Sequence, residues 1–244
     1  MKRLLLIIDP QNDFVDSKGS LYVPEAETAI GKIVEYIRTN GRNIDDIAIT
    51  QDTHHKYHIA HPAYWSPRPE PFTQITVEGY KAGKYAPVLY PSTVDKPVDP
   101  FTLQYLESLP GPLTIWPEHC LLGSWGCAFP TALVDAVQDW EINVKPQHFA
   151  NIYQKGYIAN FEAFSLFTKS GELGWRPYAN LDVFVGYDEI VVCGFAKDIC
   201  VANTVKDMKD SGLYEGVITM FEDGMASIDK NSPMMEVFNG LKTV

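Results

Sequence analysis

The stretch Arg3-Leu4-Leu5-Leu6-Ile7-Ile8-Asp9 decides the fold class. An unbroken aliphatic run is typical of a strand that is buried on both faces, as in a parallel sheet covered by helices. The run is too short for an export signal or a membrane span, so we interpret it as the first strand. Asp9 follows this strand directly. We therefore expect its carboxylate at the carboxyl edge of the sheet, where open α/β proteins bind their ligands.

The rest of the chain alternates between segments typical of helices and of strands. Hydrophobic spacing predicts helices over residues 25–39, 130–140, 198–211 and 233–241, and strands over residues 46–50, 189–193 and 217–221. Such alternation predicts βαβ units, hence an α/β fold in which helices cover both faces of a mostly parallel sheet. We expect one domain over residues 1–244, because a chain of 244 residues can bury a single large core.

Residues 66–112, which we call the excursion, follow a different pattern. Nine of the 17 prolines lie between Pro67 and Pro112, and hydrophobic periodicity is weak there. Proline lacks a backbone donor and fixes φ, so we expect this segment to lie outside the central sheet. It is either a lid or interface arm, or an ordered surface loop without a role.

Charge and composition exclude several classes of partner. The formal net charge of -11 opposes attraction to nucleic acid and to anionic lipid. Hydrophobic residues make up 45% of the chain, which predicts a compact globule rather than disorder. The four cysteines are too few for a disulfide framework and indicate a reducing, cytoplasmic compartment. We expect a small-molecule substrate and a homo-oligomer, and neither nucleic acid nor a membrane as partner.

Cys200 is the candidate nucleophile. It follows the predicted strand 189–193 at the start of a predicted helix. The positive end of a helix dipole favours a thiolate, and backbone N–H groups at such a turn can hold an oxyanion. The alternative is a buried core cysteine, so the residue needs partners.

Asp9 and Lys155 are the candidate partners. Lys155 comes at the end of a β-like stretch, so its ammonium could reach the same sheet edge as Asp9 and lower the pKa of a thiol. The alternatives are a turn-capping aspartate and a solvated surface lysine.

Asp52, His54 and His119 form an independent metal-ligand candidate. Asp52 and His54 are separated by one residue in an extended segment, which places both side chains on one side. Two histidines and a carboxylate suit zinc, iron or manganese with open positions for water or substrate. The alternative is a histidine-rich loop without metal, since His55, His58 and His61 crowd the same region.

The candidate residues lie in motifs that together resemble a known family. The chain resembles the isochorismatase-like cysteine hydrolases, most closely the nicotinamidase branch, in five segments that occur in the family's order: Ile8-Asp9-Pro10-Gln11-Asn12-Asp13-Phe14, Thr50-Gln51-Asp52-Thr53-His54, Trp116-Pro117-Glu118-His119-Cys120, Lys155-Gly156 and Gly194-Phe195-Ala196-Lys197-Asp198-Ile199-Cys200-Val201.

This resemblance implies a fold, a catalytic triad and a substrate. It implies a three-layer sandwich with a six-stranded, mostly parallel sheet. It implies the triad Asp9, Lys155 and Cys200, an oxyanion hole from the N–H groups of Ala196 and Cys200, and a cis peptide near Phe195–Ala196. Further implications are one divalent metal, zinc ahead of iron or manganese, on Asp52, His54 and His119, with His58 as an optional fourth ligand, and aromatic walls from Phe14, Trp116 and Phe164.

The implied activity is hydrolysis of nicotinamide to nicotinate and ammonia through a cysteine thioester, within NAD salvage. Thr53 and Ile199 depart from the family, which commonly has tryptophan and an aromatic residue at these positions. The departures leave open another amide, carbamoyl or ureido hydrolase, or a metal-binding homologue without turnover.

Overall fold

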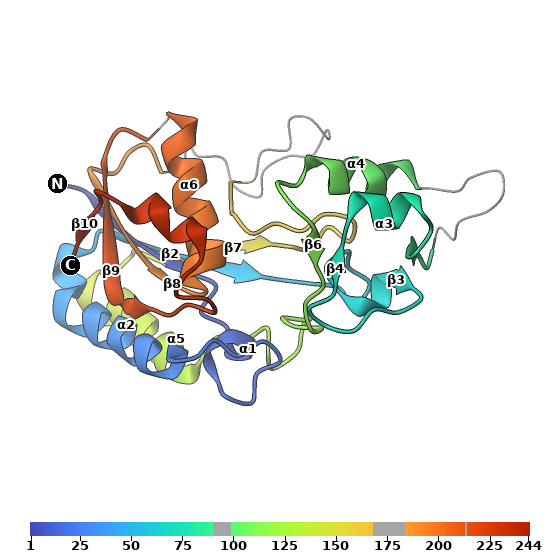
Figure 1. Cartoon of the computed structure of the whole chain (residues 1–244). Coiled ribbons are helices and arrows are strands. Elements are labelled where there is room, and N and C mark those ends of the chain that lie inside the picture. Colours follow the sequence, from blue (N-terminus) through green and yellow to red (C-terminus); the bar gives the residue numbers. More distant parts are fainter. Residues whose placement is uncertain (90–98, 168–183, 213) are drawn as a thin grey trace.

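A six-stranded sheet forms the centre of the structure, a computed structural model that describes residues 1–89, 99–167, 184–212 and 214–244 (Figure 1). The strand order is β10-β9-β8-β1-β2-β7, and all neighbouring strands pair in parallel. The strands are β1 (Arg3–Ile8), β2 (Asp46–Asp52), β7 (Asn151–Lys155), β8 (Glu189–Gly194), β9 (Val217–Met225) and β10 (Lys242–Thr243).

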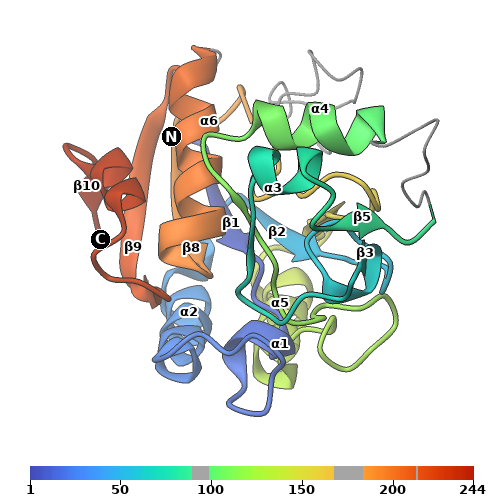
Figure 2. The ribbon, with the colours of Figure 1, turned by 45° about the vertical axis from the view of Figure 1, so that its right-hand side comes forward.

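Helices cover both faces of this sheet. On one face lie α2 (Ala26–Asn40) and α5 (Thr131–Asp139), which pack against each other, and on the other lies α6 (Ala202–Ser211) (Figures 1 and 2). The helix α2 buries a stripe of apolar side chains at helical spacing, namely Ala29, Ile30, Ile33, Val34 and Ile37. The predicted three-layer α/β architecture is confirmed.

The turn after β8 requires glycine. Gly194 has a φ of +116°, and a Cβ there would lie 2.1 Å from the carbonyl oxygen of Ile8. Only glycine allows the chain to leave β8 this close to β1. The turn thereby holds the segment after β8 against the segment after β1.

The excursion contributes no strand to the central sheet within its described residues, as predicted. It is nevertheless folded, with the short antiparallel pairs β3 (Trp65–Ser66) with β5 (Ala86–Pro87) and β4 (Gln74–Ile75) with β6 (Leu113–Thr114), and the helices α3 (Val77–Lys81) and α4 (Pro100–Ser108). Residues 90–98 lie outside the described part. A separate hydrophobic core holds this unit together: Ile59, Tyr64, Trp65, Ile75, Tyr80, Tyr105, Leu106, Leu113, Ile115, Phe161 and Ala163.

Some elements differ from the prediction at their ends. The segment predicted as a helix over 233–241 is a 3-10 helix, Pro233–Phe238, followed by β10, which is too short to show periodicity. The helix predicted from residue 198 begins with a π-helical turn, Lys197–Val201, before α6. The remaining short elements are the helix α1 (Asn12–Val15), the 3-10 turns Gly41–Asn43 and Pro62–Tyr64, and the π-helical turn Trp140–Val144.

In the part of the chain that the structure describes, no helix combines the length and the apolar character needed to cross a lipid bilayer.

A matched pair of isoleucine truncations tests the burial of the sheet. Ile190 in the inner strand β8 is wholly buried, whereas Ile152 in the edge strand β7 is 56% exposed. We expect Ile190→Ala to lower the free energy of unfolding by about 2–5 kcal/mol, because it leaves a cavity in the core. Ile152→Ala should cost about 1 kcal/mol or less. Urea unfolding measures both values, and equal losses would contradict the assigned strand order.

Candidate active site

Four adjacent strands bring the predicted catalytic and metal residues to one edge of the sheet. Asp9 follows β1, Asp52 ends β2, Lys155 ends β7, and Cys200 lies in the turn after β8. Because β8, β1, β2 and β7 are neighbours and run in parallel, their carboxyl ends meet. Asp52 and Lys155 are direct partners in the strand register.

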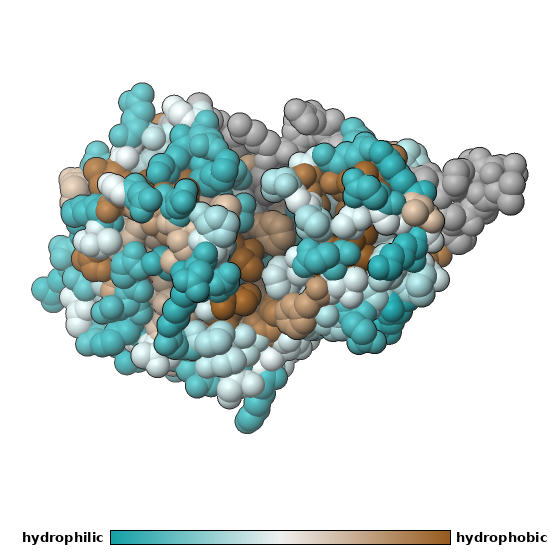
Figure 3. Space-filling model, in the orientation of Figure 1, coloured by the Kyte–Doolittle hydropathy of each residue, from teal (hydrophilic) through white to brown (hydrophobic). Residues whose placement is uncertain are grey.

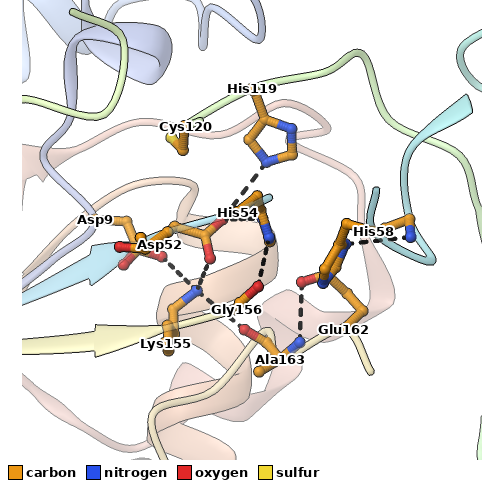
Figure 4. A network of polar contacts seen from close by, with 12 residues as sticks. Asp9, Asp52, His54, His58, His119, Cys120, Lys155, Gly156, Glu162 and Ala163 are labelled. Atoms are coloured by element: carbon orange, nitrogen blue, oxygen red, sulfur yellow. Dashed lines mark hydrogen bonds and ion pairs between the residues drawn. The ribbon is translucent and has the colours of Figure 1, made fainter. Parts of the chain in front are cut away.

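Lys155 is the centre of a buried charge cluster. Its ammonium lies 2.9 Å from Asp9 Oδ2, 3.1 Å from Asp52 Oδ1 and 3.0 Å from the Ala163 carbonyl oxygen (Figure 4). Burial acts to lower the pKa of Lys155, but Asp52 and Asp9 outweigh it and hold that pKa well above its ordinary value. The shift favours the charged form of Lys155, although its side chain is only 1% exposed.

Asp9 has the environment of a proton acceptor. The residue is wholly buried, and the Thr50 hydroxyl donates to its Oδ1 at 2.5 Å. Burial raises the pKa of the Asp9 carboxyl, and the Lys155 ammonium offsets only part of this effect. A carboxylate with a raised pKa can take a proton from a neighbouring group and return it later.

Cys200 lies beside both partners. Its Sγ is 3.7 Å from Lys155 Nζ, and the Asp9 carboxylate is close enough to act on the pKa of the thiol. Burial raises the pKa of the thiol well above its ordinary value, although Lys155 acts to lower it. The direction of this shift opposes the thiolate that a helix start favours, because desolvation disfavours the charged form. A proton acceptor beside the thiol can form the thiolate by taking its proton.

The turn between β8 and Cys200 contains the implied cis peptide, Phe195–Ala196. Ala196 and Cys200 both line the same pocket, so their N–H groups stay the predicted oxyanion donors. Asp198 holds a second loop against this turn, because its carboxylate accepts the N–H groups of Ile228 and Asp229, each at 2.9 Å. Ile228 thereby becomes part of the pocket wall.

Asp52, His54 and His119 are in mutual contact as predicted. Asp52 Oδ2 lies 2.9 Å from His54 Nε2 and 3.5 Å from His119 Nε2. The Nδ1 atom of each ring has a backbone carbonyl partner at 2.8 Å, Gly156 for His54 and Pro117 for His119. When Nδ1–H donates a hydrogen bond to a backbone carbonyl, the Nε2 atom of the same ring carries the lone pair that can bind a metal.

The electrostatics of this cluster also favour a cation. Two Nε2 lone pairs directed at one carboxylate oxygen would repel it unless a proton or a metal ion lies between them. Burial acts to lower the pKa of His54, but the carboxylates of Asp52 and Glu162 outweigh it and raise that pKa to about 9. The residues present therefore fit a divalent cation.

Three further side chains, His58, His61 and Glu162, belong to the histidine cluster. Potential ligand atoms lie within 4.8 Å of one another in two groups, His54 with His61 and His119, and His54 with His58 and Glu162. Both ring nitrogens of His58 already have backbone partners, the Phe161 carbonyl at 3.1 Å and the Ala60 N–H at 3.3 Å. The Nε2 atom of His61 lies 3.3 Å from His119 Nδ1, the ring nitrogen that does not face Asp52.

Sequence reasoning did not select His61 or Glu162. His61 lies in the loop whose histidines were noted, but its spacing does not distinguish it from His58. Glu162 precedes Ala163-Phe164 in an irregular segment where no periodicity predicts its direction. Sequence reasoning also missed Gln11, whose side chain orients Asp52 by accepting its N–H at 2.7 Å and donating to its carbonyl at 2.6 Å. The available signal was an amide side chain in the short segment after the first strand.

A pocket of about 370 Å³, including its open mouth, lies above the catalytic residues. It contains all three predicted aromatic walls beside Cys200, and its lining residues are Phe14, Leu21, Asp52, Trp116, His119, Glu162, Phe164, Ala196, Ile199, Cys200 and Ile228. Apolar side chains gather in a hollow that lies between the excursion on one side and the helix-covered sheet on the other (Figure 3). The aromatic and aliphatic lining suits a small ring-containing substrate.

No protein-family model matches the chain. The chain is 26% identical over 216 residues to a nicotinamidase of Saccharomyces cerevisiae, an alignment that covers 88% of this chain and 85% of the relative. The crystal structure of a nicotinamidase/pyrazinamidase from Acinetobacter baumanii superposes with a TM-score of 0.65 at 25% identity, covering 100% of this chain and 95% of that one.

A pyrazinamidase of Pyrococcus horikoshii, solved in complex with zinc, superposes with a TM-score of 0.58 at 21% identity and covers 100% of this chain and 99% of that one. At this identity the likeness supports the fold.

A substitution at Gly156 tests the metal centre without changing a ligand. A Cβ on Gly156 would lie 2.5 Å from Asp52 Oδ1 and 2.7 Å from His54 Cε1, whereas a Cβ on Gly111 meets no atom within 4 Å. We expect Gly156→Ala to weaken metal affinity about 10- to 100-fold, because it displaces two ligands together. Gly111→Ala should leave the affinity unchanged. Metal content after dialysis against graded chelator measures both, and unaltered binding by Gly156→Ala would contradict this ligand set.

Proposed function

We propose that this chain, a homologue of the nicotinamidases in sequence and fold, is a metal-assisted cysteine amidohydrolase that converts nicotinamide to nicotinate and ammonia. One observation carries the proposal: Cys200 lines a pocket whose walls include Asp52 and His119, and the Lys155–Asp9 ion pair lies beside its thiol. The nucleophile and two metal-ligand candidates therefore face the same small volume, with a proton acceptor buried behind the nucleophile.

Asp9 begins the reaction by taking the proton of the Cys200 thiol. The thiolate Sγ then attacks the amide carbon, and the resulting oxyanion accepts hydrogen bonds from the N–H groups of Ala196 and Cys200. Protonated Asp9 gives its proton to the amide nitrogen, the C–N bond breaks, and ammonia leaves. The acyl group stays on Cys200 as a thioester.

Water completes the cycle. Asp9 takes one proton from the water molecule, whose oxygen attacks the thioester carbon, and the C–S bond breaks. The proton returns to Sγ, which restores the protonated resting thiol that burial favours. The net reaction consumes one amide and one water and produces one carboxylic acid and one ammonia.

Lys155 keeps its charge throughout. It faces Asp9, Asp52 and Sγ at once, so it stabilises each anion that forms in turn. Burial alone disfavours the thiolate form of Cys200. The Lys155 ammonium opposes this effect and lowers the energy of the thiolate relative to the thiol.

Asp52, His54 and His119 would hold one divalent transition metal, and we propose zinc ahead of iron or manganese because of the nitrogen-rich ligand set. When bound, the metal supplies a Lewis acid that can anchor a ring nitrogen of the substrate. The chain's own contribution is to direct the Nε2 atoms of His54 and His119 at Asp52 Oδ2, with each ring held by a backbone carbonyl at its Nδ1 atom.

The pocket walls favour a flat ring. Phe14, Trp116 and Phe164 surround the space above Cys200. Each aromatic partner contributes about 0.5–1.5 kcal/mol beyond area burial when it packs against a ring.

Ile199 lines this pocket in place of the aromatic residue that the family resemblance implies, which favours a second candidate, hydrolysis of a different small amide. Ammonia release from a panel of amides decides between the two.

Replacing the nucleophile tests the mechanism. Cys200→Ala should lower kcat by a factor of about 10⁴ or more and leave the fold intact, because no other group can form the thioester. Cys193→Ala is the matched control, since Cys193 is also buried but its thiol donates to the Leu6 carbonyl within the sheet. A thiol reagent should label Cys200 ahead of Cys120, Cys127 and Cys193. Residual turnover in Cys200→Ala would argue against covalent catalysis.

Comparing two amides tests the role of the metal. Nicotinamide should have a higher kcat/KM than benzamide, which lacks the ring nitrogen, and removal of the metal with a chelator should reduce the difference. Each tenfold difference corresponds to about 1.4 kcal/mol of transition-state stabilisation. If the metal-loaded protein cleaves both equally well, the metal does not bind the ring nitrogen and a general cysteine amidase is the better assignment.

A further inference from the structure

One of the three oxygen partners of Lys155 comes from an irregular segment. Its ammonium carries three protons, and its oxygen neighbours are Asp9, Asp52 and the carbonyl of Ala163. The two carboxylates extend from ordered sheet strands or their ends. Ala163, in contrast, lies in residues 156–163, which follow β7 without helix or strand structure. The position of this carbonyl therefore depends on what packs against the segment.

One side of the segment is held by the loop after β2. The Gly156 carbonyl has His54 Nδ1 at 2.8 Å, and the Ala159 carbonyl accepts the Ile59 N–H at 2.7 Å. The Phe161 carbonyl has His58 Nε2 at 3.1 Å. These contacts fix the first part of the segment; Glu162 is approached by His58 at 3.8 Å and its carboxylate accepts the Ala163 N–H at 2.9 Å.

The other side is held by Tyr105 in helix α4 of the excursion. The Tyr105 ring packs edge-on against Phe161, with centroids 5.4 Å apart and an interplanar angle of 64°. Its hydroxyl also donates a long hydrogen bond of 3.5 Å to the Glu162 carbonyl. Phe161 and Ala163 are both buried in the hydrophobic core of the excursion, at 6% and 0% exposure. The excursion thus packs directly on the segment that supports the catalytic lysine.

We propose that Tyr105 is a positioning residue for Lys155, and that the excursion serves the active site by fixing the Ala163 carbonyl through Tyr105 and Phe161. This inference rests on the proposed function for its kinetic consequence. The inference assigns the excursion a role at the active site and therefore argues against an ordered surface loop without a role.

The physical consequence follows from the hydrogen bonds of the ammonium. If the Ala163 carbonyl moves away, only the carboxylates of Asp9 and Asp52 still hold Lys155, and the ammonium shifts toward them. Its distance to Cys200 Sγ, now 3.7 Å, then increases. A displacement of about 1 Å at a catalytic group can reduce the rate by about 10²-fold. Phe14 and Trp116 bind the substrate from other segments and are unaffected, so the loss falls more on kcat than on KM.

Two buried tyrosines of the excursion provide a matched comparison. Tyr105 and Tyr80 are 3% and 2% exposed and belong to the same hydrophobic core, but only Tyr105 contacts residues 161–163 in the geometry above. The variants are Tyr105→Leu, Tyr105→Phe, Tyr80→Leu and Phe161→Leu, the last of which loosens the same contact from the other side. Urea unfolding checks their stability, kcat and KM are measured on nicotinamide, and iodoacetamide alkylation of Cys200 is followed at one fixed pH.

We expect Tyr105→Leu and Phe161→Leu to lower kcat at least about tenfold more than Tyr80→Leu, at similar KM, and to change the alkylation rate of Cys200. Tyr105→Phe keeps the ring contact and should stay within about twofold of the unmodified protein. If Tyr105→Leu does not fold, Phe161→Leu and Tyr105→Phe still decide. Equal kcat and equal alkylation rates in the Tyr80→Leu and Phe161→Leu variants would overturn the proposal.

The failure of the proposed function is distinguishable from the failure of this inference. If the unmodified protein releases no ammonia from nicotinamide, the proposed substrate is wrong. The alkylation rates of Cys200 still report the position of Lys155 in that case. Unchanged alkylation in both Tyr105→Leu and Phe161→Leu would then contradict the positioning role.

Discussion

The structure of the site depends on one buried cation, the ammonium of Lys155, which lies 2.9 Å from Asp9 and 3.1 Å from Asp52. Two carboxylates could not stay ionised this deep in the protein without it, because desolvation of an unpaired charge is costly. Asp9 belongs to the catalytic group and Asp52 to the metal group. The same lysine therefore joins the two halves of the chemistry, and its position affects both.

Parallel β topology explains how such a cluster forms from residues far apart in the chain. Strands β8, β1, β2 and β7 are adjacent and end at the same edge. Side chains that follow these strands must meet there, whatever their separation in sequence. The sequence was enough to predict Asp9, Asp52, Lys155 and Cys200, because an apolar strand followed by a polar residue is visible without a structure.

The remaining features depend on three-dimensional packing. His61 and Glu162 come from irregular segments, where no periodicity gives a side-chain direction. The protonated state of Cys200 could not be predicted either, because the burial that raises its pKa is a property of the folded site. The helices α3 and α4 are short and lie among prolines, so their pattern was too weak to identify, and the core they build next to residues 161–163 was missed with them.

The central claim is that the cation-supported thiol of Cys200 forms a covalent acyl intermediate. Mass spectrometry of the acid-quenched protein and of its peptides tests it directly, because acid preserves a thioester. During turnover of nicotinamide, a nicotinoyl group should be found on the peptide that contains Cys200, and it should be absent from a Lys155→Met variant that cannot stabilise the thiolate. Continued release of nicotinate with Cys200 unmodified at every quench time, or normal turnover by Lys155→Met, would contradict the account.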